Sequence, residues 1–163
     1  AASDVYKRQL YEGLIQDVLK RLRNDESSVL SGVLWVHGEI ECREPEAARE
    51  YAGALAELIS GLRSDLGMPE LLFAMLMPWP YAHLVPALPE FLTGLHALER
   101  ELPHFRLIRA TDPTGLHPLE VYADRYTSLE ESPFDAPDVF NHYTEAGMRA
   151  AGELLARHVR GGW

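Results

Sequence analysis

The chain has 163 residues with 25 acidic and 15 basic side chains, which give a formal net charge of −10. This length is enough for one domain with one core. The absence of a basic surplus argues against nucleic acid as a partner. Cys42 is the only cysteine, so an internal disulfide and a multi-cysteine metal site are both excluded. No apolar run approaches the roughly 18 residues that a membrane span needs, so no membrane-spanning segment is expected.

The first residues look unlike the rest of the chain. Residues 3–9 (SDVYKRQ) resemble a translated sequencing adapter of the kind found at the ends of metagenomic reading frames. We therefore expect residues 1–9 to be a non-native leader and residues 10–160 to form a single, partial domain. The natural protein is then expected to extend further upstream.

A helix is predicted first, over residues 10–23, because apolar side chains recur there at helical spacing and basic residues fill the last turn. After a polar loop, residues 29–36 are predicted to form a strand. Its continuous apolar character is typical of a central parallel strand that is covered on both faces.

The second helix is predicted to begin at Pro45, since proline is favoured at the first helical position, and to end at Gly67. A second apolar strand is predicted over residues 71–77. It stops at Pro78-Trp79-Pro80, because proline cannot continue a ladder of hydrogen bonds.

The third helix is predicted over residues 87–101, and a short strand follows at residues 105–110. Residues 111–137 are a long irregular stretch, and such loops in compact domains are usually functional or mobile. The last helix is predicted over about 144–159, with Thr144 as its N-cap. Strands that alternate with helices indicate right-handed crossovers and a parallel sheet, so the fold class is α/β.

Two polar groups of residues could carry chemistry. His37, Gly38 and Glu39 follow the first strand, and the carboxyl ends of parallel strands are where α/β proteins bind ligands. The alternative is a turn with two solvated side chains. Near the C-terminus, Asp138 precedes His142. In a catalytic triad, the histidine is the general base and a neighbouring carboxylate orients its ring. Two surface polar groups in a loop are the alternative there.

Other candidates are weaker. The seven histidines contain no HxxxH or HxH pair, so no metal site is expected. Trp79 and Tyr81, beside the end of a strand, could stack on a sugar ring or could cap the core. No serine lies in a G-x-S-x-G or Gly-Asp-Ser context, so no nucleophile is identified among these residues.

Four motifs in the same order resemble the sialate O-acetylesterase and carbohydrate esterase family six group of SGNH hydrolases. Residues 32–39 (GVLWVHGE) are similar to the family block G-V-x-W-x-Q-G-E, and residues 10–15 (LYEGLI) to the helix before it. Residues 51–69 are similar to Y-x3-L-x2-LI-x2-LR-x-DLG-x-P. Residues 142–147 (HYTEAG) are similar to the terminal block that carries the catalytic histidine. The resemblance covers residues 10–158.

This resemblance implies a three-layer α/β/α sandwich with a parallel sheet and an esterase that removes acetyl groups from carbohydrates by a Ser-His-Asp mechanism. It implies His142 as general base, Asp138 as its orienting acid, and His37, Gly38 and Glu39 as support for the oxyanion or the site. The serine belongs to an N-terminal G-Q-S-N block, which we expect upstream of residue 10 together with a first strand. This chain alone is then expected to be inactive.

The same resemblance implies an acetylated carbohydrate as substrate, no cofactor, and a secreted or periplasmic location. Two positions depart from the family pattern. His37 replaces glutamine, and Asp138 lies four residues before His142 where the family acid lies three before. The loop could absorb the extra residue, Asp135 could serve as the acid, or the triad could be degenerate. A non-catalytic carbohydrate-binding relative is therefore the alternative function.

Overall fold

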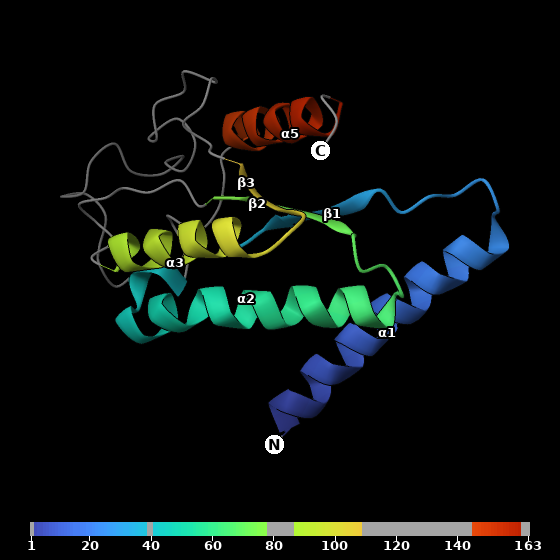
Figure 1. Ribbon diagram of the computed structural model, residues 1–163, viewed down its shortest axis with the longest axis horizontal. Helices are drawn as coiled ribbons and strands as arrows, with labels where there is room; N and C mark the ends of the chain where they lie inside the picture. Colours follow the sequence, from blue (N-terminus) through green and yellow to red (C-terminus); the bar gives the residue numbers. More distant parts are fainter. Residues whose placement is uncertain (1, 39–40, 78–86, 109–144, 161–163) are drawn as a thin grey trace.

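The computed structural model describes residues 2–38, 41–77, 87–108 and 145–160. Helices and strands alternate along them as predicted (Figure 1). In chain order, the elements are α1 (Ala2–Asn24), β1 (Gly32–Val36), a 3-10 turn η1 (Glu41–Arg43), α2 (Pro45–Asp65), β2 (Leu72–Leu76), α3 (Leu88–Glu101), β3 (Phe105–Ile108) and α5 (Glu145–Arg160).

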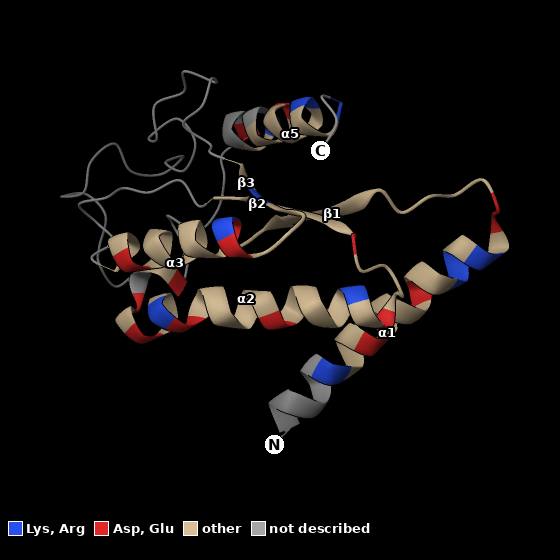
Figure 2. Ribbon diagram, in the orientation of Figure 1, with Lys and Arg blue, Asp and Glu red and all other residues tan. Residues whose placement is uncertain are grey.

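The sheet has the strand order β1-β2-β3, and both pairings are parallel. Trp35 lies beside Met75, and Met75 lies beside Leu107, so the carboxyl ends of all three strands meet at one edge. The predicted α/β class with a parallel sheet is confirmed. Among the described residues, the charged ones belong to the helices and connections, except for Arg106 in β3 (Figure 2).

One face of the sheet is covered by α2 and α3, which lie side by side below it in Figure 1. The alternate residues of the strands that point to this face join the apolar stripes of the two helices in a single core. Its most deeply buried large members are Ile59, Phe73, Met75, Phe91 and Leu95. Full burial of each such side chain contributes about 1.5–3 kcal/mol, so this face carries most of the packing.

The opposite face is covered unevenly. α5 lies on that side of the sheet (Figure 1), and its Leu154 is 1% exposed. Leu76 and Ile108 are also buried, but Leu34 and Val36 in β1 are 43% and 45% exposed. The prediction of a central strand covered on both faces is therefore wrong for β1 within the described residues. There, β1 ends the strand order, and β2 is the central strand.

The end of α2 is built by the sequence that follows it. The Met68 N–H donates to the Arg63 carbonyl at 2.8 Å, and the Gly67 N–H donates to the Ser64 carbonyl at 3.1 Å. This is a Schellman motif, which requires a left-handed residue, and Gly67 has φ = +67°. The glycine predicted to end the helix does so by this geometry.

α1 is longer than predicted and continues without a break across residue 9. It is tied to the fold by Ile15, which is 6% exposed, and by the Tyr11 hydroxyl, which donates to Asp65 Oδ2 at 2.9 Å. Leu10 and Leu14 remain exposed. The non-native leader over residues 1–9 stays a prediction. No helix among the described residues is long and apolar enough to cross a membrane.

Candidate active site at the carboxyl edge of the sheet

β1 ends at Val36, and the chain turns directly afterwards. Gly38 has φ = +119°, a conformation that residues with a Cβ rarely adopt, and it is buried. Its carbonyl accepts a hydrogen bond from the Cys42 N–H at 3.0 Å, which leads the chain through η1 into α2. Gly38 therefore places His37 at the carboxyl edge of the sheet and returns the chain at once to the helix that covers the core.

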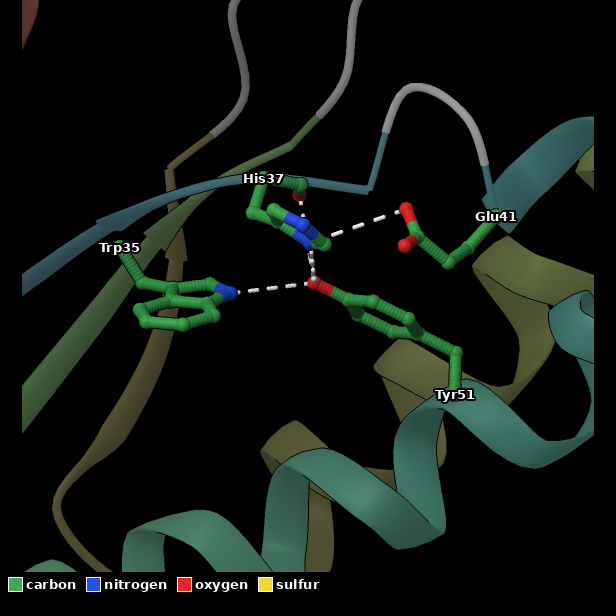
Figure 3. A network of polar contacts seen from close by, with 4 residues as sticks. All are labelled: Trp35, His37, Glu41 and Tyr51. Carbon is green, nitrogen blue, oxygen red and sulfur yellow. Dashed lines mark hydrogen bonds and ion pairs between the residues drawn. The ribbon is translucent and has the colours of Figure 1, made fainter. Parts of the chain in front are cut away.

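Four polar side chains meet at this edge (Figure 3). The Trp35 indole Nε1–H donates to the Tyr51 hydroxyl at 3.1 Å. That same hydroxyl lies 3.3 Å from the His37 ring Nδ1 and 3.3 Å from the His37 backbone carbonyl oxygen. Glu41 Oε2 lies 3.7 Å from Nδ1, which makes an ion pair when the imidazole is protonated.

Tyr51 is the fixed centre of this network. It comes from the second turn of α2, is 9% exposed, and packs against Phe91 with ring centroids 4.7 Å apart. The His37 ring stacks on it at 6.1 Å, with an angle of 10° between the ring planes. A buried tyrosine needs a partner for its hydroxyl, and here that partner is the end of β1.

His37 itself is open to a ligand. Its side chain is 51% exposed, whereas Glu41 is 30% exposed and Tyr51 is buried. A half-exposed imidazole beside a carboxylate, held against a buried phenol, can exchange hydrogen bonds with a bound polar molecule. The edge can therefore recognise hydroxyl or carbonyl groups.

The structure brings His37 and Gly38 together at the edge where the sequence placed them. The remaining predicted site residues lie outside the described residues: Glu39, Trp79, Tyr81, Asp138 and His142. Their roles stay predictions. In the part of the chain that the structure describes, no group of three or more histidine, cysteine or acidic residues could hold a metal ion.

Sequence reasoning assigned no role in the site to Tyr51 or Glu41. Tyr51 lies on the buried face of α2 with Ala48, Leu55, Ile59 and Leu62. The available signal was its hydroxyl, since a tyrosine among buried aliphatic residues needs a polar partner. Glu41 stands four residues after His37, in the short connection between β1 and α2.

Comparisons with known proteins agree with the resemblance of the motifs. A family model described as carbohydrate esterase, sialic acid-specific acetylesterase, matches residues 3–116. An X-ray structure of a protein from Arabidopsis thaliana is similar in fold, with a TM-score of 0.57 and 19% sequence identity. The similarity covers 90% of this chain and 52% of that one, so this chain spans about half of that protein's length. None of the curated proteins matches the chain.

The family match covers well over half of the 163 residues and includes β1, the polar edge, α2, β2, α3 and β3. The predicted family is therefore confirmed. The chain belongs to the sialic acid-specific acetylesterase family of carbohydrate esterases.

Proposed function

We propose that this chain is part of a carbohydrate O-acetylesterase, which removes acetyl groups from sialic acid or a related sugar. The observation that carries the proposal is the polar edge formed by His37 and Gly38. It lies at the carboxyl end of β1 in a chain whose family is defined by acetylesterases. Ligands bind at this edge in open α/β sheets.

The reaction follows a serine esterase mechanism. A serine outside these 163 residues attacks the acetyl carbonyl, and His142 accepts the serine proton. Asp138 orients His142 and stabilises the imidazolium. Collapse of the tetrahedral intermediate expels the sugar hydroxyl, which takes the proton from His142. Water then hydrolyses the acetyl-serine, with His142 again as base, and releases acetate.

The residues after β1 and β2 support this reaction by contacts with the substrate. His37 and Glu39 hold the sugar or the oxyanion beside the strand end, and the Gly38 backbone lets the ligand approach closely. Trp79 and Tyr81 supply apolar surface for the sugar ring. The mechanism needs neither metal nor organic cofactor.

The test is to recover the coding sequence upstream of residue 10 and to express the extended chain. We expect a G-Q-S-N-like block after an apolar strand, and we expect the extended protein to release acetate from O-acetylated N-acetylneuraminic acid. Replacing its serine by alanine, or His142→Ala, should reduce kcat by at least about 10³-fold. The 163-residue chain alone should release none. Hydrolysis by this chain alone, or an inactive extended protein with an intact block, contradicts the proposal.

His37 favours a second candidate function, a carbohydrate-binding relative that has lost catalysis. The block that residues 32–39 resemble has glutamine at this position, and Asp138 lies one residue further from His142 than the acid of the motif that residues 142–147 resemble. This candidate predicts that the complete gene lacks the serine block. It also predicts that the extended protein binds the acetylated sugar in calorimetry without releasing acetate.

A further inference from the structure

We propose that the outer edge of β1, the edge that faces away from β2, pairs in parallel with a strand from the segment that precedes α1 in the complete protein. This strand carries the serine block, and its carboxyl end places the serine beside His37. The role of that serine rests on the proposed function. The place of the strand does not, because it follows from the two edges of the sheet and from the face that α1 occupies.

The outer edge of β3 is closed by the chain itself. The Leu107 N–H donates to Glu99 Oε1 at 2.8 Å, so a carboxylate of α3 takes the place that a further strand would need. β3 has only four residues, and one of them, Arg106, is charged and exposed. Short strands and charged side chains are typical of edges that are protected against pairing. β3 is therefore built as an edge strand.

Among the described residues, β1 shows none of these protections. It carries no charged residue, and no described strand pairs with its outer edge. The register puts Leu34, Ala74 and Arg106 in one row on the same face of the sheet. That row ends in a charged side chain at β3 but in Leu34, which is 43% exposed, at β1, and Val36 on the same face is 45% exposed. β1 therefore has the composition of an interior strand.

The helices fix the direction in which the sheet is built. The chain steps from β1 to β2 through α2 and from β2 to β3 through α3, and both helices cover the same face (Figure 1). α1 lies on that face too, because Ile15 belongs to the core that α2 and α3 form and Tyr11 donates to Asp65 of α2. Connections between parallel strands are right-handed in about 98% of cases, and crossovers of one hand on one face step in one direction. A crossover through α1 therefore starts from a strand on the outer side of β1.

A strand at this position brings its carboxyl end to the candidate site. The carboxyl ends of parallel strands lie at the same edge of a sheet, and for β1 that edge is where His37 follows Val36. A serine block directly after the strand thus lies next to His37, with β1 and its neighbours unchanged. Ligands bind at this edge in open α/β sheets, so the serine and His37 can contact the same sugar.

Hydrogen exchange of the β1 amides measures the pairing directly. NMR spectra compare the 163-residue chain with the extended chain that includes the upstream segment. Alternate β1 amides, those that are not bonded to β2, should exchange at least about tenfold more slowly in the extended chain, because they gain a strand partner. The Leu107 amide is the internal control, since it already donates to Glu99 in this chain. Equal exchange of β1 in the two chains, or slowing that Leu107 shares to the same extent, overturns the proposal.

Thiol labelling tests the face of the sheet independently. Leu34→Cys should react at least about tenfold more slowly with an alkylating reagent in the extended chain, where the added strand and its connection cover this position. Arg106→Cys is the matched control, because it lies in the same row at the opposite edge and should react alike in both chains. Peptide mapping separates these labels from any on the buried Cys42. Unchanged labelling of Leu34→Cys overturns the proposal.

The outcomes separate this inference from the proposed function. Protected β1 amides in an extended protein that releases no acetate leave the strand in place and defeat the esterase. Unprotected β1 amides in an active extended esterase defeat only the inference about the strand. If protection requires concentrations at which gel filtration shows a dimer, the outer edge of β1 binds a second copy and the proposal is wrong. A complete gene without an apolar strand upstream of α1 also overturns it.

Discussion

The indole nitrogen of Trp35 lies 3.1 Å from the phenol oxygen of Tyr51, and this hydrogen bond joins β1 to α2 where the core ends and the candidate site begins. Trp35 also packs against the core, and Tyr51 packs on Phe91 of α3. The helices that bury the sheet therefore also fix the polar groups around His37. Stability and site geometry are coupled through one buried hydroxyl.

Tyr51→Phe is expected to lower the free energy of unfolding by about 1–2 kcal/mol. The ring packing is kept, but the part-buried Trp35 N–H loses its acceptor, and unsatisfied buried donors are costly. Urea denaturation followed by tryptophan fluorescence measures the change. Tyr11→Phe should cost less, because its hydrogen bond to Asp65 is exposed and water can replace it. Equal losses in the two variants contradict the idea that burial makes the Tyr51 network costly to break.

Gly67→Ala is expected to destabilise the chain by about 1–2 kcal/mol, since the left-handed backbone conformation of Gly67 is strained for a residue with a Cβ. No heavy atom from the rest of the chain lies within 4 Å of the position a Cβ would take, so the cost comes from the backbone conformation and not from contacts with neighbouring side chains. Thermal unfolding measures it.

Gly53→Ala is the matched control for that prediction. It lies inside α2 and also has open space around its Cβ position, but it has a helical backbone. This substitution should stabilise the chain by about 0.5–1 kcal/mol, because alanine is the better helix former. The two glycines should therefore respond with opposite signs, and the same sign in both would exclude the backbone explanation.

The described elements were predictable because each one carries a local signal. The stripe of α2, the proline at its start and Gly67 after its end set its bounds to within a residue or two. The neighbours of β1 were not predictable in this way. An apolar run shows that a strand tolerates burial, but strand order depends on pairings between distant segments, so the exposure of Leu34 and Val36 has no local signal.

The candidate site was likewise predictable only where the sequence carries a local signal. His37 and Gly38 could be placed from sequence, because polar residues after an apolar strand lie at the carboxyl edge of a parallel sheet. Tyr51 could not be assigned to that edge, because the contact of its hydroxyl with His37 depends on the orientation of α2 relative to β1. In this orientation Tyr51 packs on Phe91, which is 40 residues further along the chain.

Arg63→Lys is expected to cost about 1–2 kcal/mol in urea denaturation. The guanidinium donates from Nε to the Leu71 carbonyl at 3.1 Å and from Nη2 to the Pro103 carbonyl at 2.8 Å, which ties the end of α2 to the connections before β2 and β3. Burial lowers the pKa of Arg63, yet a guanidinium remains charged, so the loss should not depend on pH near neutrality. A lysine ammonium lacks the rigid fork that spans two carbonyls. Arg100→Lys, at an exposed position of α3, should change stability by less than about 0.5 kcal/mol.

Tyr11 is expected to lose its proton later than ordinary tyrosines on alkaline titration. Desolvation, the hydrogen bond to Asp65 and the negative charge of Asp65 raise the pKa of Tyr11 from 10.0 to about 12. Because the folded state keeps this proton longer than the unfolded state, the contribution of Tyr11 to stability is complete below about pH 10 and is lost as the pH rises towards 12. Phenolate absorbance of the wild type minus that of Tyr11→Phe isolates the titration. Asp65→Asn removes the charge but not the desolvation, which is the largest cause, so it should lower the pKa of Tyr11 only in part. A midpoint near 10 in the difference titration would contradict the prediction.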